Sequence, residues 1–462
     1  MGRYRKNKWS WWSYFKNTSR KLYTWLILLF SIFLTLLFYE FWNYWFLALI
    51  ILFTIILAIW KQWLKITILI VAILTLTLYY FFIYKNNVLL DEKIDINTHF
   101  QKLNQSEFTF KYKNFDILIK DKNISENYIY NGQFIIEKID FSLQTNSKMM
   151  YLKSKNIFYQ VQKINFIKEI KVNDSIILKI KNFLNNDKFY YSKFVPLLLI
   201  AEYGNDEKEL LDILKKVGIY HIFVISGFHI VLIKTLIEKF FKLLKMKNGY
   251  GFITFTSFTL IYLIILNFPV SALRAFIFLL FKEFNKKILK NKFTNIELLT
   301  FIALIFFINN IFVIYSYSFI LSFFITLIIL LINQIKIKNN VFKLLLISVL
   351  ASIFSTIILN YNSLAQYNLL SSINSILIAP VVSILYILCF LCFWYVDFLD
   401  ILFNIFFIFL KYYAMWQIFI DVSLHFVLSS SIIALFFIAI PLTLTINYEK
   451  FNKNIDKTIA KF

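Results

Sequence analysis

Cysteine, histidine and glycine are scarce in this chain of 462 residues, which contains two, four and seven of them. Both cysteines, Cys389 and Cys392, lie in one apolar run without a histidine or a second cysteine pair. This pattern argues against a zinc or redox site. Three residues apart, the two side chains share one helix face, and we interpret them as small buried apolar groups. We expect no metal and no cofactor.

Acidic residues and arginine are also few. Aspartate and glutamate total 26 against 49 lysines and arginines, so the formal net charge is +23. Nucleic-acid binders are basic, but so are the cytoplasmic loops of membrane proteins, and charge alone does not separate the two classes. The only arginines are Arg3, Arg5, Arg20 and Arg274. Because lysine is the default cation of this chain, an arginine inside an apolar segment indicates a need for a guanidinium group.

Apolar residues are what the chain has in excess. They make up 60% of it, and the mean hydropathy is +0.67. This excludes an ordinary soluble protein and predicts a polytopic α-helical membrane protein. Residues 1–21 carry seven basic residues and no acidic one, which predicts a cytoplasmic end in contact with membrane lipids. Three expected spans, residues 22–39, 41–60 and 64–84, then place the following stretch outside the cell.

Residues 85–193 have a different pattern and predict a separate extracellular domain. Five segments between residues 107 and 183, the last of them DSIILKIKNF at 174–183, alternate apolar and polar side chains. This predicts five or six strands, for which a small closed β-barrel is the economical arrangement. An oligonucleotide-binding barrel is one option among several. Its lysines and aromatic rings suit single-stranded nucleic acid, and they equally suit a solvated lysine-rich barrel with an aromatic core.

Residues 194–447 are again mostly apolar. Residues 202–212 hold five carboxylates without a histidine, and we interpret them as a solvated surface rather than a metal site. Basic loops set the topology, with about twelve transmembrane helices in total and both chain ends inside. The loops expected in the cytoplasm are residues 234–247, 282–292, 336–343 and 450–461.

One apolar segment concentrates polar residues. Residues 218–230 read GIYHIFVISGFHI and hold two of the four histidines and two of the seven glycines. Because the apolar run reaches Ile237, we predict one membrane-crossing helix whose polar groups face protein or water. On such a helix His221 and His229 share one wide face but do not easily chelate one ion.

Ser226 and His229 are three residues apart, which suits a nucleophile and its base. No acid lies nearby to orient the histidine, and no oxyanion hole is evident, so this arrangement is a weak prediction of hydrolase chemistry. A helix break at Ser226 and Gly227, or a close approach of another backbone, agrees better with these residue types.

A second polar block, residues 268–276, reads FPVSALRAF and contains Arg274. An arginine in an apolar segment is costly and faces a cavity or a partner. Two interpretations stay open. The guanidinium group can bind the phosphates of a passing polyanion by forked hydrogen bonds, or it can be a structural tie to Glu283, Glu238 or a helix carbonyl.

These two blocks resemble the signatures of the competence domain in the ComEC family of DNA-uptake membrane proteins. Weaker matches at residues 318–322 (SFILS) and 368–380 (NLLSSINSILIAP) extend the resemblance over residues 194–446. The resemblance implies a channel, not an enzyme, that conducts single-stranded DNA inward across the plasma membrane, with an oligonucleotide-binding (OB-like) domain outside. The motif residues expected along the DNA path are Gly218, His221, Ser226, Gly227, His229, Pro269, Ser271 and Arg274.

Many members of the ComEC family end in a metallo-β-lactamase-like domain, which the resemblance suggests as a nuclease. No His-x-His-x-Asp-His run occurs here, and Phe462 follows shortly after the last expected span. We therefore expect that domain to be absent and a separate nuclease to degrade the second strand. The sequence also has no Gly-x-x-x-x-Gly-Lys-Ser/Thr phosphate loop, so a cytoplasmic ATPase or helicase is the expected motor.

Two other functions remain open. A small-solute permease also uses broken helices and a midplane arginine but needs no external barrel. A membrane hydrolase would use Ser226 and His229. The sequence leaves the oligomeric state undetermined. The expected domains are a basic cytoplasmic N-terminus (1–21), three transmembrane helices (22–84), an extracellular OB-like β-barrel (85–193), a competence-type transmembrane domain (194–447) and a cytoplasmic tail (448–462).

Overall fold

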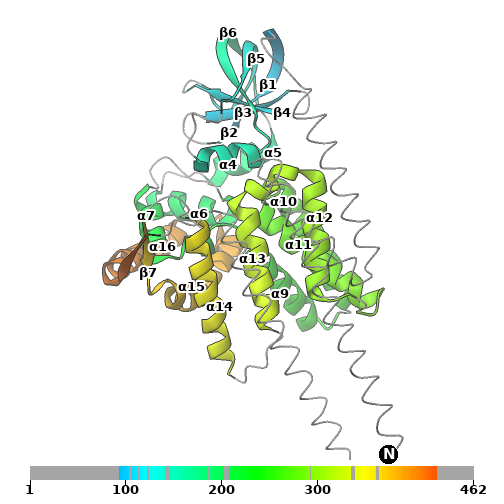
Figure 1. Ribbon diagram of the computed structural model, residues 1–462, viewed down its shortest axis with the longest axis vertical. Coiled ribbons are helices and arrows are strands. Elements are labelled where there is room, and N and C mark those ends of the chain that lie inside the picture. The colour runs from blue at the N-terminus through cyan, green and yellow to red at the C-terminus, as the bar shows by residue number, and fades with distance from the viewer. Residues whose placement is uncertain are drawn as a thin grey trace, which may run out of the picture.

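A β-sheet domain stands at one end of a helical domain in the computed structural model (Figure 1). The predicted cytoplasmic N-terminus, the three N-terminal spans, the last span and the C-terminal tail lie outside the described residues, as do residues 202–207 of the acidic stretch. The structure describes residues 93–103, 107–112, 115–121, 124–140, 146–173, 175–184, 188–201, 208–246, 248–291, 293–333, 339–359 and 364–423.

The β-domain contains one six-stranded sheet with the spatial order β1-β5-β6-β4-β3-β2. Neighbouring strands are antiparallel except β4 and β6, which pair in parallel. Its strands are β1 (Lys93–His99), β2 (Gln101–Lys102), β3 (Glu107–Tyr112), β4 (Phe115–Lys120), β5 (Tyr128–Lys138) and β6 (Tyr159–Val172).

The two strands at the ends of this order, β1 and β2, are separated in the chain only by Phe100. They are therefore halves of one strand, of which the first half pairs with β5 and the second with β3. The sheet curls around Phe100, whose ring is 1% exposed and lies 5.5 Å from the Phe110 ring and 6.3 Å from the Phe134 ring. A curled sheet of five such strands is consistent with the predicted OB-like domain.

The strand predicted at residues 174–183 is wrong, because this segment forms helix α5 (Ile176–Leu184). Ile176, Ile180 and Leu184 recur every four residues, a spacing that forms an apolar stripe along a helix. The same segment also alternates apolar and polar residues, so its pattern fits a helix as well as a strand. Leu184 is buried in the core of the helical domain, and this contact favours the helix. A further helix, α4 (Asn146–Ser154), lies between β5 and β6 in the chain.

The helical domain follows, together with a small two-stranded sheet of β7 and β8. Its elements are α6 (Phe189–Ile200), α7 (Lys208–Val217), α8 (Tyr220–Phe223), α9 (Gly227–Leu243), α10 (Asn248–Ile265), α11 (Val270–Lys287), α12 (Asn295–Asn309), η3 (Ile311–Tyr315), α13 (Tyr317–Ile332), α14 (Asn340–Leu359), β7 (Leu364–Asn368), α15 (Ser371–Cys392), α16 (Val396–Tyr413), η4 (Ala414–Trp416) and β8 (Phe419–Ser423).

Two helices in the described part are long and apolar enough to cross a membrane, Ser371–Cys392 and Val396–Trp416. The predicted total of about twelve transmembrane helices is not confirmed. The predicted break near Pro269 is present, because α10 ends at Ile265 and α11 begins at Val270. Five further apolar helices are shorter: Phe189–Ile200, Gly249–Ile265, Asn295–Phe307, Tyr317–Ile332 and Asn340–Ser352.

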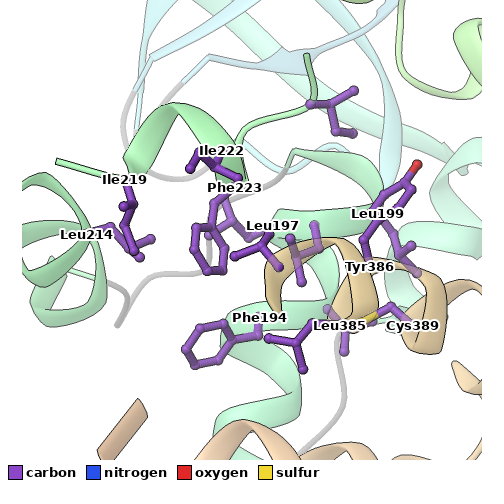
Figure 2. Close-up of a cluster of buried hydrophobic side chains, with 14 of the residues drawn as sticks. Phe194, Leu197, Leu199, Leu214, Ile219, Ile222, Phe223, Leu385, Tyr386 and Cys389 are labelled. Atoms are coloured by element: carbon purple, nitrogen blue, oxygen red, sulfur yellow. The ribbon is translucent and has the colours of Figure 1, made fainter. Parts of the chain in front are cut away.

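Helix α6 is the centre of the larger core. Figure 2 shows Phe194, Leu197 and Leu199 of this helix among side chains of α8 and α15. The helix begins where the Asp400 carboxylate of α16 accepts hydrogen bonds from the backbone N–H groups of Tyr190 and Tyr191, at 2.8 and 2.9 Å. This carboxylate satisfies two backbone donors that a helix start leaves unpaired, and so fixes α6 against α16.

Candidate functional site

The polar segment at residues 218–230 begins with a tight turn at the end of α7. Gly218 has φ +82°, a left-handed conformation, and the backbone N–H of Ile219 donates to the Leu214 carbonyl at 3.0 Å. This is the usual glycine C-cap of a helix. A Cβ atom at position 218 would lie 2.7 Å from the Ser371 Cβ. Glycine is therefore required here both for the turn and for the contact with α15.

Two asparagine side chains hold the same turn. Asn368 and Asn374 donate to the last carbonyls of α7, those of Lys216 and Val217, each at 2.8 Å. Both amides also donate to the Gln417 side-chain oxygen, at 2.9 and 2.6 Å. The block at residues 368–380 is thus a clamp on the end of α7, because its amides satisfy carbonyl groups that the helix leaves free.

The single crossing helix predicted through Ser226 is wrong, whereas the helix break expected at Ser226 and Gly227 is confirmed. The chain forms the four-residue helix α8, an extended residue at Val224, and a new helix, α9, with Ser226 as its N-cap. His221 is exposed and His229 is fully buried, so the two histidines do not share a helix face. The reason is local, because serine and histidine at the N-cap and third positions form a capping box that starts a helix.

The capping box fixes the geometry of Ser226 and His229. The Ser226 Oγ accepts from the backbone N–H of Phe228 at 3.3 Å, and the His229 Nδ1 accepts from the backbone N–H of Ser226 at 3.1 Å. The Oγ and Nδ1 atoms are 3.4 Å apart. Because Nδ1 already accepts a backbone proton, it is poorly placed to take one from the hydroxyl. The pair therefore builds a helix start.

The other side of the His229 ring faces the core. Its ring centroid lies 4.5 Å from that of Tyr386, with the rings edge to face. The Tyr386 hydroxyl donates to the Tyr262 hydroxyl at 3.2 Å, which donates to the Leu199 carbonyl at 2.7 Å. The first residues of α9 are thereby tied to α15, α10 and α6.

Gly227 is the point of contact between α9 and α11. An added Cβ would lie 3.0 Å from the Ala275 Cβ and 3.4 Å from the Arg274 Nη2. One turn away, the Ser271 Oγ donates to the Ile225 carbonyl at 3.1 Å. The two polar blocks of the sequence are therefore packed against each other, which agrees with the predicted close approach at Gly227.

The Arg274 side chain extends from this contact to α13, at the segment SFILS of residues 318–322. Its Nε and Nη2 atoms donate to the Ser322 Oγ at 3.0 and 2.7 Å, and the guanidinium carbon lies 5.9 Å from the Phe323 ring centroid. Of the two interpretations left open for Arg274, the structural tie takes a different partner here, Ser322 rather than Glu238 or Glu283. Those carboxylates lie 3.0 and 4.0 Å from the Lys234 Nζ instead.

The electrostatics of this junction are positive. Helices α9 and α11 both begin here, at Ser226 and at Pro269, the N-cap of α11. A helix N-terminus carries about half a positive charge. Arg274 is 9% exposed, and within the described residues its recorded hydrogen bonds go to a neutral hydroxyl rather than to a carboxylate. Anions are therefore favoured at this place.

The structure thus brings together Ser226, Gly227, His229, Ser271 and Arg274, with Pro269 at the start of α11. Gly218 and the neighbouring His221 belong to the turn held by α15. Sequence analysis missed the roles of three residues, Ser322, Asn374 and Tyr386. The first two lie in the blocks SFILS and NLLSSINSILIAP, which gave a usable signal, whereas nothing in the sequence singles out Tyr386. Among the described residues, no group of three or more His, Cys, Asp or Glu side chains is arranged to hold a metal ion.

Comparison with known proteins gives a family and one relative. A family model described as "Competence protein" matches residues 198–450, more than half of the chain. The chain is also similar to "Uncharacterized protein MG316" of Mycoplasma genitalium, with 27% identity over 266 residues that cover 55% of this chain and 68% of the relative. No solved structure matches.

Proposed function

Because this chain belongs to the competence-protein family, a role in DNA uptake is supported, and we propose the specific role of a membrane channel that conducts single-stranded DNA inward across the plasma membrane. The observation that carries the proposal is the junction of α9, α11 and α13. There, two helix N-termini and Arg274 present positive charge, and in the described part of the chain the guanidinium donates to a neutral hydroxyl group. DNA carries one negative charge per phosphate, which such a site favours over neutral solutes.

The proposed path begins outside the cell. The OB-like barrel at residues 85–193 receives the strand and passes it to the helical domain at residues 194–447, with the three spans at 22–84 as additional membrane anchors. Residues 1–21 and 448–462 lie in the cytoplasm in this arrangement. Gly218, His221, Ser226, Gly227, His229, Pro269, Ser271 and Arg274 are the proposed path and motif residues.

The proposed partners follow from the same scheme. A cytoplasmic ATPase or helicase supplies the pulling force, and a separate nuclease degrades the second strand. The chain itself acts as a channel and carries out no chemical step.

A hydrolase is disfavoured by the geometry of Ser226, whose Oγ accepts a backbone hydrogen bond while the His229 Nδ1 accepts another. A small-solute permease remains the second candidate, since Arg274 in a broken-helix region also suits an anionic solute. The barrel distinguishes the two functions, because a permease has no use for an external domain that binds nucleic acid.

The direct test is uptake of labelled DNA into the cytoplasm of cells that lack the gene. We expect internalised DNA to be lost and to return when the gene is supplied on a plasmid. The control is uptake of several labelled anionic solutes by the same cells. Unchanged DNA uptake in the deletion strain, together with a defect for one solute, would replace the channel by the permease.

A further inference from the structure

Helix α4 covers part of the outer face of strands β3 and β4. Ile117 and Ile119 of β4 point into the barrel core, so Leu118 between them points outward. Leu118 is nevertheless 1% exposed, because it packs in a small cluster with Leu152 of α4, Ile139 and Ile157. Its cross-strand neighbour Thr109 is also buried.

The same helix joins the barrel to the helical domain. The Lys148 ammonium of α4 pairs with the Glu107 carboxylate of β3. At the other end of the helix, the Asn310 side chain donates to the Ser154 carbonyl at 3.1 Å. Figure 1 shows α4 between the sheet and the helices. Helix α4 is therefore held between β3 and the helical domain, over part of the outer face of β3 and β4.

This cover matters for ligand binding, since the second and third strands are where OB-fold barrels hold oligonucleotides. With β1 and β2 counted as one strand, β3 and β4 are the second and third strands of this barrel. Part of that face, around Thr109 and Leu118, is therefore covered here, while Lys111 and Lys120 on the same side stay exposed. This partial cover directs attention to the other outer face of the barrel.

The open outer face is formed by β1, β5 and β6. Tyr130, Gly132 and Phe134 of β5 are buried inside, so the alternate residues of β5 point outward. The cross-strand register pairs these outward positions with exposed residues of β6. The pairs are Ile129 with Lys171, Asn131 with Lys168, Gln133 with Phe166 and Ile135 with Lys163. On the other side of β5, its outward residues Ile129, Asn131 and Gln133 pair with His99, Asn97 and Asp95 of β1.

The chemistry of this face suits a polyanion with aromatic bases. Lys163, Lys168 and Lys171 are exposed along one strand, and Phe166 between them is 51% exposed. Phosphates need such cations, and an exposed ring stacks on a base. Asp95 is the one carboxylate in these rows.

The neighbouring carboxylate on β6, that of Glu169, is turned toward another partner. The Tyr130 hydroxyl donates to it at 3.3 Å. Burial raises the pKa of this tyrosine, so it remains a protonated donor at neutral pH. The Glu169 carboxylate is thereby held on the side of the sheet where Tyr130 lies, away from the side that carries Lys163, Lys168 and Lys171.

We propose that the outer face of β1, β5 and β6, with Lys163, Lys168, Lys171 and Phe166, is the surface on which this barrel binds single-stranded DNA, rather than the β3 and β4 face, part of which α4 covers. The proposal rests on the proposed DNA channel and names the first contact of the strand with it. Binding is independent of sequence, since charge and stacking carry it.

The test measures binding of a fluorescent oligothymidylate to the full-length protein in nanodiscs. Lys163→Gln, Lys168→Gln and Lys171→Gln are combined in one variant. We expect this variant to reduce the magnitude of the slope of log K against log salt concentration by about 2. Each phosphate contact to a single strand contributes about 0.7 to that slope. The matched control combines Lys102→Gln, Lys111→Gln and Lys120→Gln, which removes three exposed lysines from β2, β3 and β4. We expect it to bind as the wild type does.

Phe166 provides the second arm. Phe166→Ala should weaken binding about 5- to 150-fold, the range that stacking of one base spans, whereas Phe166→Trp keeps a ring and should bind at least as well as wild type. Inorganic polyphosphate of matched charge should compete less well than oligothymidylate, since it has no base to stack.

Each contrary result has its own meaning. Weaker binding in the control triple variant but not in the Lys163, Lys168 and Lys171 variant would overturn the proposed surface and leave the channel intact. Equal competition by polyphosphate, with Phe166→Ala unchanged, would overturn the base-binding role of this face. A wild-type protein that binds no oligothymidylate would remove the external DNA-binding step from the proposed function, and this surface with it.

Discussion

Arg274 and Ser322, 48 residues apart in the chain, are joined by two hydrogen bonds from the guanidinium Nε and Nη2 atoms to one hydroxyl oxygen, at 3.0 and 2.7 Å. A hydroxyl group orients the guanidinium without cancelling its charge. A carboxylate at position 322 would have made an ion pair and removed the attraction for phosphate. The Nη2 atom of Arg274 also lies beside Gly227, 3.4 Å from the position of an added Cβ, at the start of α9.

Substitution of Arg274 separates a role on the DNA strand from a structural role. If the guanidinium guides phosphates, Arg274→Ala should abolish uptake per folded molecule, and Arg274→Lys should retain part of it as a point charge. The measurement is internalised labelled DNA divided by the amount of folded protein. Lys234→Met is the control. Lys234 is a cation on α9, which packs against α11, but its ammonium group is already paired with Glu238. Normal uptake per molecule in Arg274→Ala would show that this arginine does not act on DNA.

Ser226 is predicted to act as a helix cap rather than a nucleophile. Ser226→Ala should lower the free energy of unfolding by about 1 kcal/mol through loss of the cap. Thr294→Ala is the matched control, because Thr294 and Glu297 form the same capping box at α12, and it should cost a similar amount. Thermal unfolding in detergent measures both. Labelling of the wild type by a serine-directed probe, absent in Ser226→Ala, would instead establish a hydrolase.

Gly218 should not tolerate a side chain. Gly218→Ala places a Cβ 2.7 Å from the Ser371 Cβ at a left-handed φ of +82°, and the backbone conformation alone costs about 1–2 kcal/mol. Gly249→Ala is the control, because an added Cβ there meets nothing within 4 Å and lies in a helix that favours alanine. We expect a lower unfolding temperature for the first variant and an unchanged or higher one for the second. Equal unfolding temperatures would contradict the clamp at this turn.

The membrane orientation is testable by cysteine labelling. Single cysteines at Asn131 and Asn454, in a background without Cys389 and Cys392, should differ in reaction with an impermeant maleimide. We expect position 131 to react in intact cells, because three expected crossings follow an N-terminus that we propose is cytoplasmic, and position 454 to react only after permeabilisation. The reverse pattern would place the barrel in the cytoplasm and rule out its role as the first contact of entering DNA.

The polar blocks of the site are evident in the sequence, but their geometry is not. The scarcity of glycine, histidine and arginine drew attention to Gly218, Ser226, His229 and Arg274, because each is a costly choice in an apolar segment. The alternation of apolar residues likewise predicted strands β3 to β6, but not β1 and β2. These signals are local, since residue type and spacing carry them.

The errors arose where local patterns are ambiguous. The run through Ser226 has the length and hydropathy of one spanning helix, yet a turn at Gly218 and a capping box at Ser226 divide it. The segment at 174–183 suits a strand or a helix equally, and the burial of Leu184 in the helical core decided for the helix.

The sequence by itself determined the composition of the chain, a separate β-domain and the polar blocks, because hydropathy, periodicity and rare residues are properties of the chain alone. Only the tertiary structure decided the partners of these residues. Ser322 rather than Glu283 binds Arg274, and α4 rather than solvent covers Leu118. Such contacts join residues far apart in the chain, and their selection depends on how whole helices and strands pack, which no spacing rule within one segment encodes.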